Sequence, residues 1–165
     1  VGNDLVGGQL ALVAACKAAG VKRFVPSEWG FPKEKFPTGG SVIFEAKRMV
    51  TDNAEALGVP YMPIYVGGLM EYFVGMPYFG FDLRQAKATI YGDANHALYS
   101  LTIADLARAV AQLLVMPRSM QFGQPVEIAG QMTSSAELVR IAEKITGKKF
   151  EITNVSQEVW RGMMM

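Results

Sequence analysis

The chain has 165 residues; half of them are hydrophobic and 19% are charged, and sixteen basic against fifteen acidic residues give a net charge of +1. This hydrophobic content excludes general disorder, and the balanced charge argues against nucleic acid or an anionic membrane as the partner. One cysteine and one histidine exclude a disulfide framework and argue against a metal site. Because the apolar runs are too short to span a bilayer, we expect a soluble, cytoplasmic protein.

The two ends of the chain carry no recognisable start or stop signal. Val1 is not an initiator methionine, and no targeting segment with a charged region, an apolar core and a cleavage site follows it. We therefore expect the chain to be an internal piece of a longer protein.

The first half of the chain alternates predicted helices, over 5–19 and 41–57, with predicted strands, over 22–25 and 59–66. The first helix is apolar nearly all round, so we expect it to be buried on several sides. Prolines within and after the strands predict irregular pairing. Helix and strand in this order, with short connections, predict an α/β fold built on a parallel sheet.

The second half predicts shorter elements. The segment 67–85 is crowded with large apolar and aromatic side chains and lacks a clear period. Ser134 with Glu137 forms a capping box, and Gly147 ends the helix that follows. The other predicted elements are strands over 88–91, 98–101 and 125–129 and a helix that begins after Thr102.

Lys47 and Arg48 lie on different parts of the predicted helix over 41–57. The apolar face of this helix comprises Ile43, Ala46, Val50, Ala54 and Leu57. Arg48 lies in the middle of the polar face with acidic neighbours, so we expect a solvated cation. Lys47 borders the apolar face, where burial would lower its pKa and suit the amine to proton transfer. The alternative is a lysine whose stem covers apolar surface and whose amine stays in water.

Two segments directly follow the predicted strands, at the carboxyl edge where open α/β sheets bind ligands. The segment 26–30, Pro-Ser-Glu-Trp-Gly, is either a ligand-binding loop or a plain turn with a buried tryptophan. Gly67 and Gly68 suit either a tight turn or a backbone that lies against a ligand. The apolar residues after them form either core or a substrate wall. We expect His96 to lie in a surface turn and Cys16 to be an inert core residue.

Several of these segments together resemble one known family. The stretch 18–30, Ala-Ala-Gly-Val-Lys-Arg-Phe-Val-Pro-Ser-Glu-Trp-Gly, is similar to the "AGVKRFxPSEFG" stretch of the isoflavone reductase-like and NmrA-like family of atypical short-chain dehydrogenases/reductases. Lys47 stands eleven residues before Gly58-Val-Pro-Tyr61, the offset of the family's catalytic lysine. The segments 91–93 and 102–106 also look like later family segments.

The resemblance implies a Rossmann-type domain with a parallel sheet, a smaller α+β substrate domain, and hydride transfer from NADP(H), or NAD(H), to a small apolar or aromatic substrate. By this resemblance, residues 1–68 form the C-terminal half of the nucleotide-binding domain, and 69–165 form the substrate region with some return to the first sheet. Lys47 would be the catalytic proton donor or acceptor. The cofactor would contact Pro26, Ser27, Glu28, Trp29, Lys47, Gly67, Gly68 and Leu69, and the substrate would contact Met70, Tyr72 and Phe73.

The sequence departs from the family pattern in three ways. The glycine-rich dinucleotide fingerprint is absent from residues 1–165. Thr51 stands where the reductases usually have an arginine, and 67–69 reads Gly-Gly-Leu where plant reductases often have Asn-Cys-Phe. These departures leave open a non-catalytic protein that senses NAD(P) and regulates transcription. Because the predicted strands would lack the neighbours that the absent first part of the domain supplies, we expect this chain alone to expose an apolar sheet edge and to self-associate or bind nucleotide poorly.

Overall fold

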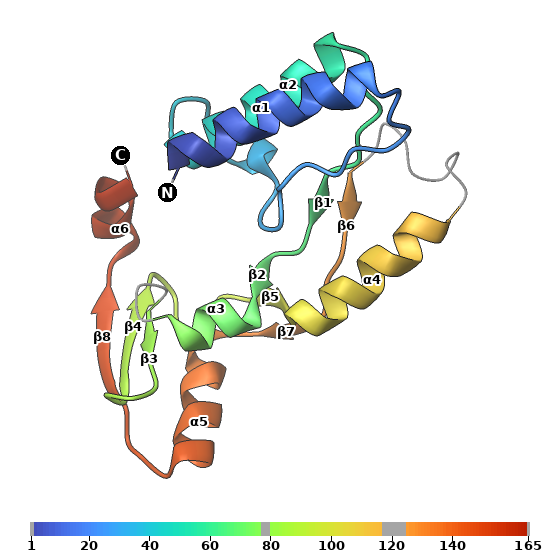
Figure 1. Cartoon of the computed structure of the whole chain (residues 1–165). Coiled ribbons are helices and arrows are strands. Elements are labelled where there is room, and N and C mark those ends of the chain that lie inside the picture. The colour runs from blue at the N-terminus through green and yellow to red at the C-terminus, as the bar shows by residue number, and fades with distance from the viewer. Residues whose placement is uncertain (1, 77–79, 117–124, 165) are drawn as a thin grey trace. The chain divides into compact units, whose positions relative to one another are not determined.

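The computed structural model describes residues 2–76, 80–116 and 125–164. The chain divides into two compact units, Val1–Tyr65 with Ala109–Ile128, and Val66–Arg108 with Ala129–Met165. Helices and short strands with parallel pairs occur in both (Figure 1). The predicted α/β class is therefore confirmed. Among the helices that the structure describes, none combines the length and the hydropathy needed to cross a membrane.

The first unit is built around two packed helices, α1 (Gly2–Ala18) and α2 (Val42–Ala56), with the short helix η1 (Lys33–Lys35) between them in the chain. α2 ends before Gly58, whose φ of +63° is a conformation that glycine adopts without strain. The core of this unit consists of Val13, Cys16, Phe24, Val50, Ala54 and Val59.

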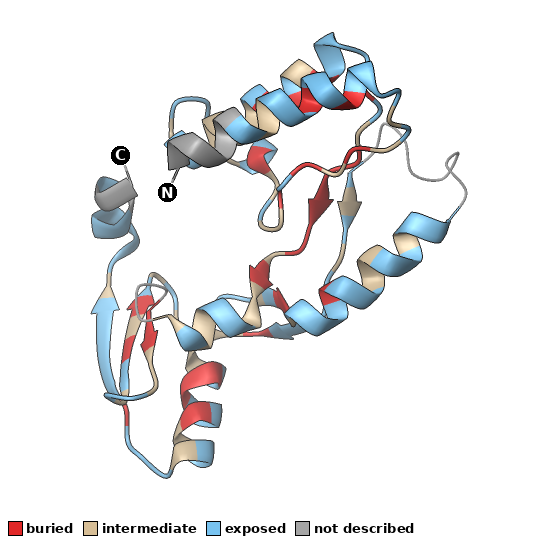
Figure 2. Cartoon of the chain, viewed as in Figure 1, coloured by how far each residue is buried: buried red, intermediate tan, exposed pale blue. Residues whose placement is uncertain are grey.

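The prediction that the first helix is buried on several sides is wrong. Of the α1 side chains that the structure describes, Val13 and Cys16 are buried, while Leu12 is 51% exposed; Figure 2 shows exposed positions along much of the part of α1 that is not grey. The helix packs on α2 along one face, and among the described α1 side chains those away from this contact are exposed or half-buried. Cys16 is a buried free thiol, as expected.

The apolar face of α2 is also narrower than the sequence predicts. Val50 and Ala54 are fully buried, but Ile43 is 63% exposed and Leu57 is 36% exposed. Val50 and Ala54 pack in one cluster with the α1 residues. Ile43 and Leu57 are at the two ends of the predicted apolar face and remain partly or largely exposed.

The strands of the first unit are shorter than predicted. Within 22–25 only Phe24 pairs, in an isolated parallel bridge with Tyr61. In 59–66 only β1 (Ile64–Tyr65) forms a strand, which pairs in parallel with β6 (Val126–Glu127). The prolines that interrupt these segments lack the N–H that a longer ladder needs, which explains the short pairing.

One sheet of the second unit combines three short strands. β2 pairs in parallel with β5, and β5 pairs antiparallel with β7. The hydroxyl of Thr102 accepts from the N–H of Asp105 at 3.0 Å at the start of the following helix, as predicted. These elements are β2 (Gly68–Leu69), α3 (Met70–Gly75), β5 (Leu98–Leu101) and β7 (Gln131–Thr133). The helix α4 (Ile103–Val115) begins in the second unit and ends in the first.

The other sheet of the second unit pairs β4 with β3 and with β8, the latter in parallel. Its core packs against α5, where the Ser134 hydroxyl accepts from the Glu137 N–H at 3.2 Å and Gly147 follows with φ of +68°, so the predicted cap and stop are confirmed. These elements are β3 (Phe81–Asp82), β4 (Lys87–Tyr91), α5 (Ser135–Thr146), β8 (Glu151–Val155) and α6 (Gln157–Met164).

Candidate active site

The loop between the Phe24 bridge and η1 carries the first group of predicted cofactor residues. Pro26 and Glu28 are buried, whereas Ser27 is exposed and Trp29 is half-buried. The Ser27 N–H donates to the side-chain oxygen of Gln9 on α1 at 2.9 Å. Trp29 has a φ of +27°, which residues other than glycine rarely adopt. The surrounding contacts therefore hold this loop in a strained shape, as is common at functional sites.

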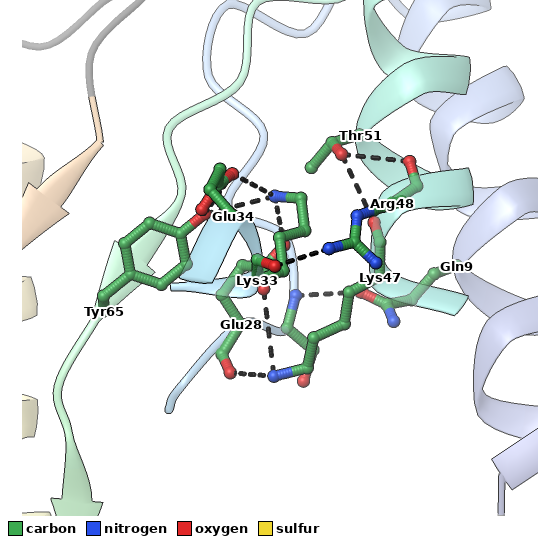
Figure 3. A network of polar contacts seen from close by, with 9 residues as sticks. Gln9, Glu28, Lys33, Glu34, Lys47, Arg48, Thr51 and Tyr65 are labelled. Atoms are coloured by element: carbon green, nitrogen blue, oxygen red, sulfur yellow. Dashed lines mark hydrogen bonds and ion pairs between the residues drawn. The ribbon is translucent and has the colours of Figure 1, made fainter. Parts of the chain in front are cut away.

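Glu28 places a carboxylate inside the first unit, with its side chain only 1% exposed. Oε1 accepts a hydrogen bond from the Lys33 amine at 3.0 Å. Oε2 lies 3.8 Å from the Lys47 amine and accepts no hydrogen bond among the residues that the structure describes. Each carboxylate oxygen thus faces a different lysine (Figure 3).

Lys47 extends from α2 to this loop, with its side chain 18% exposed. Its amine donates to the main-chain carbonyl of Glu28 and lies 5.9 Å from the centre of the Phe44 ring. Burial lowers the pKa of Lys47 from its usual 10.5, and the repulsion of Lys33 adds to this, while the attraction of Glu28 opposes it. The burial and the direction of the shift agree with the expectation from the helix register; proton transfer by this amine stays a prediction.

Lys33 is more deeply buried than Lys47, with its side chain 8% exposed. Its amine donates to Glu28 and to the Tyr65 hydroxyl at 3.1 Å, and lies 3.3 Å from a carboxylate oxygen of Glu34. Burial acts to lower the pKa of Lys33, but the hydrogen bonds to Tyr65 and Glu28 outweigh it, so the pKa lies above its usual value. Lys33 is therefore a permanent cation.

Tyr65, at the end of β1, closes the polar cluster on its other side. Its hydroxyl accepts from Lys33 and donates to the Glu34 carboxylate, whose oxygens both lie at 3.1 Å. Burial raises the pKa of Tyr65 to about 12, although the nearby lysine opposes the shift. The phenol stays protonated at neutral pH and is not suited to exchange protons there.

The expectation that Arg48 is a solvated cation is wrong. Its guanidinium donates to the carbonyls of Lys33 and Phe36, each at 2.6 Å, pairs with Glu45, and has its side chain 20% exposed. Although Arg48 lies on the polar face of α2, the η1 segment folds over that face. Arg48 therefore attaches η1 to α2 and fixes the backbone that carries Lys33.

Thr51, where the family usually has an arginine, is buried within α2. Its hydroxyl donates to the carbonyls of Lys47 at 3.3 Å and Arg48 at 3.0 Å. The side chain thus satisfies its hydrogen bonding on its own helix, as threonine often does.

The predicted cofactor residues Gly67, Gly68 and Leu69 belong to the second unit. Gly67 has a φ of +65°, and a Cβ there would collide with the carbonyl of Tyr99. A Cβ on Gly68 would collide with the ring of Phe73. Internal packing alone therefore requires both glycines, and a role of 67–69 in cofactor binding stays a prediction.

The predicted substrate residues lie on α3. Met70 packs against the core cluster that contains Phe81, Tyr72 is 42% exposed, and Phe73 is half-buried. Met70 thus contributes to the core, and contact of these three residues with a substrate stays a prediction. Tyr78 and Phe79, from the same apolar segment, lie outside the described residues.

Other features of the described chain lie apart from these residues. His96 is exposed, and its N–H donates to the Asp93 carbonyl in a turn, as predicted. Within the described ranges, no three His, Cys, Asp or Glu side chains are grouped to hold a metal ion. An open hollow of about 310 Å³ contains none of the predicted site residues, being lined by Arg140, Glu143, Lys144, Gly147, Lys148 and Lys149.

Sequence reasoning missed Lys33, Glu34 and Tyr65. In the sequence, Lys33 and Glu34 look like charged residues of a solvated loop, and their contacts with Tyr65 join residues about thirty positions apart. One signal was available: a tyrosine in a strand predicted to be buried needs a hydrogen-bond partner for its hydroxyl. That signal identifies Tyr65 as a residue with a polar partner but does not say which one.

A family model and curated proteins from plants are similar to this chain in sequence. The family model described as NmrA-like family matches residues 2–165. The chain is 34% identical over 162 residues to pinoresinol reductase 1 of Arabidopsis thaliana, covering 91% of this chain and 49% of that protein. It is 29% identical to an isoflavone reductase of Cicer arietinum, covering 95% of this chain and 51% of that protein. The chain thus spans about half the length of these curated relatives.

A solved structure described as AtPrR2 with NADP+ and (+)pinoresinol is also similar. It matches with a TM-score of 0.78 and 32% identity, over 94% of this chain and 52% of that chain. The backbone likeness agrees with the α/β fold described above and with the resemblance carried by residues 18–30 and Lys47. Because the family model covers nearly every residue, the chain belongs to the NmrA-like family.

Proposed function

We propose that the full-length protein is an NADPH-dependent reductase that transfers hydride to a small aromatic or apolar substrate, with Lys47 as the proton donor or acceptor. The relatives named above are reductases of pinoresinol and isoflavones, which favours an enzyme over a cofactor-sensing regulator. The NADP+ in the AtPrR2 structure favours NADP(H) over NAD(H). The cytoplasmic location stays part of this proposal.

The observation that carries the proposal is the half-buried amine of Lys47, held at the Glu28 carbonyl. A general acid or base works best when its pKa lies near the working pH. Burial moves the pKa of Lys47 downward from 10.5, which is the direction that proton exchange near neutrality requires. The amine is also held in place by the Glu28 carbonyl, so it has a defined position from which to transfer a proton.

The residues around Lys47 fit a cofactor that carries hydroxyl groups. The buried Oε2 of Glu28 accepts no hydrogen bond within the described chain, and such an acceptor favours a ligand that brings a donor. NADP(H) would supply the hydride. Pro26, Ser27, Glu28, Trp29 and Lys47 of the first unit would hold it, together with Gly67, Gly68 and Leu69.

The same proposal assigns the remaining predicted roles. Residues 1–68 would belong to the nucleotide-binding domain, and 69–165 would form most of the substrate-binding part. Met70, Tyr72 and Phe73 would contact a small-molecule substrate. The partner would be this substrate, and neither nucleic acid nor a membrane is proposed as one.

The direct test measures NADPH oxidation by the full-length protein with pinoresinol, an isoflavone and simple aromatic ketones. We expect turnover of at least one substrate, and we expect Lys47→Ala to lower kcat by about 100-fold or more, the usual contribution of general acid–base catalysis. Lys22→Ala is the matched control, because Lys22 is an exposed lysine of the same unit.

Binding of NADPH to each variant, measured by calorimetry, separates catalysis from cofactor affinity. Retained binding with lost turnover in Lys47→Ala supports a catalytic lysine. If wild type and Lys47→Ala bind NADPH and are equally inert on every substrate, the enzyme proposal fails in favour of a sensor.

A further inference from the structure

Two lysines, the buried Lys33 and the half-buried Lys47, share the carboxylate of Glu28. The Lys33 amine is 3.0 Å from Oε1, and the Lys47 amine is 3.8 Å from Oε2. The hydrogen bond is made only on the Lys33 side, while Lys47 donates instead to the main-chain carbonyl of the same residue. Lys33 thus binds the Glu28 carboxylate by a hydrogen bond, whereas Lys47 lies near the same carboxylate without forming one.

The two lysines are also anchored differently. Lys33 has a second hydrogen bond, to Tyr65, and its own carbonyl is fixed by Arg48. Lys47 has no second carboxylate within ion-pair distance among the described residues, and its amine lies 5.9 Å from the centre of the Phe44 ring. Lys33 is therefore the lysine that stays with Glu28, and Lys47 is the one that can change its charge.

A buried carboxylate left without a counterion is costly. If Lys47 were the only partner of Glu28, release of its proton would leave the carboxylate unpaired, and the attraction between the two would hold the amine in its charged form. With Lys33 present, Glu28 keeps a cation in both protonation states of Lys47.

We propose that Lys33 is a positioning residue, a permanent counterion that holds Glu28 so that the Lys47 amine can gain and lose a proton inside the first unit. The proposal rests on the proposed function for its biological meaning, but it concerns the charge of Lys47 and can be measured without substrate or cofactor. The lowered pKa of Lys47 and the raised pKa of Lys33 agree with this division of roles.

Several other groups could influence the titration of Lys47. The neighbour on α1, Gln9, carries no charge. Because a substitution at Lys33 changes the identity of none of the others, and Lys33→Arg keeps the cation, comparing the two kinds of variant assigns a shift of the Lys47 titration to the charge of Lys33. The charged and titratable groups of the cluster are Glu28 from the loop, Lys33 and Glu34 from η1, Glu45 and Arg48 from α2, and Tyr65 from β1.

The test measures the titration of Lys47 in the 165-residue chain by acylation with acetic anhydride at a series of pH values, with mass spectrometry to read the modification of each lysine. Only the neutral amine reacts, so the rate at Lys47 follows its deprotonation. We expect the midpoint to rise by about one pH unit in Lys33→Met, because a nearby cation shifts a pKa by that order. Lys33→Gln, which can still donate to Glu28, should show the same rise and is the second variant if the methionine variant does not fold.

Two further variants sharpen the result. Lys33→Arg keeps the cation and should keep the midpoint close to that of wild type. Lys35→Met, at an exposed lysine of the same short helix, should leave the midpoint unchanged. In the full-length enzyme, the Lys47-dependent limb of the kcat profile should move to higher pH in Lys33→Gln, with little change in KM.

An unchanged Lys47 midpoint in the folded Lys33→Gln variant overturns the proposal, as does an equal shift in Lys33→Arg, since charge would then not be the cause. If the labelling shift is found but the full-length protein reduces no substrate, the proposed function fails and the counterion role of Lys33 stands.

Discussion

Lys33 and Lys47 both end near the Glu28 carboxylate, and burial acts to lower the pKa of both amines, but the net shifts of the two pKa values are opposite. Two hydrogen bonds to buried side chains more than offset the burial of Lys33, whereas the hydrogen bond of Lys47 to the Glu28 carbonyl and its longer contact with the Glu28 carboxylate do not offset the burial of Lys47. At neutral pH the folded protein is therefore stabilised by the charge of Lys33 and weakened by the charge of Lys47. Functional sites commonly carry such a local cost.

This difference predicts unequal effects on stability. Lys33→Met should lower the free energy of unfolding by about 3 kcal/mol, because it leaves Oε1 of Glu28 and the Tyr65 hydroxyl without their donor. Lys47→Met should change it by less than about 1 kcal/mol, because Glu28 keeps Lys33 and a penalised charge is removed. Urea unfolding at pH 7, followed by circular dichroism, measures both.

The pH dependence of the free energy of unfolding provides a control for this prediction. The folded-state pKa of Lys47 lies below its unfolded value of 10.5, so the unfolded state binds more protons between these two values and stability rises with pH there. Wild type should therefore gain stability relative to Lys47→Met as pH rises through that window toward 10.5. Equal losses in Lys33→Met and Lys47→Met at pH 7 would contradict the unequal roles.

At the scale of elements, local sequence signals define the helix ends and the strands predicted over 88–91 and 98–101, but they do not identify every strand. α5 begins at a capping box and ends at a left-handed glycine, both of which act within a few residues. The strand β8 pairs in parallel with β4 over five residues although most of its side chains are exposed. It therefore has no alternating pattern, and its existence depends on the partner strand.

The cap of α5 can be tested directly. Ser134→Ala should lower the stability of the second unit by about 1 kcal/mol, because the Glu137 N–H loses its acceptor. Ser135→Ala, at the first residue of the helix, should have almost no effect. Thermal unfolding of both variants measures the difference, and equal melting temperatures would show that the Ser134 hydroxyl does not stabilise the helix.

At the scale of the whole molecule, large apolar side chains remain in contact with solvent. Val42 is 76% exposed and Met49 is 56% exposed, and seven residues apart on α2 they share one face. Leu12 on α1 is also half exposed. Apolar surface of this kind promotes association between protein molecules.

We therefore expect the 165-residue chain to self-associate in solution. The double variant Val42→Ser with Met49→Ser should shift the distribution toward monomer in sedimentation velocity, because less apolar surface is then removed from water on association. Ile145→Ser is the control, since it replaces an exposed apolar residue of the second unit. A wild-type chain that is monomeric at every concentration would contradict this expectation.

The sequence by itself determined the features that depend on neighbours in the chain. The α/β class, the ends of α5 and the burial of Lys47 follow from helix period, caps and glycines, and the match of residues 18–30 to a family pattern indicated the NmrA-like family. Each of these signals is complete within about twenty residues.

Only the tertiary structure decided which charged side chains contact one another. Lys33 and Glu34 have the composition of a solvated loop, and Arg48 lies on a polar helix face, yet the fold brings them together around Tyr65 and Glu28. The burial of α1 on one side alone was likewise set by its contact with α2. The physical reason is that desolvation and ion pairing depend on distances in space, which the spacing of residues along the chain does not define.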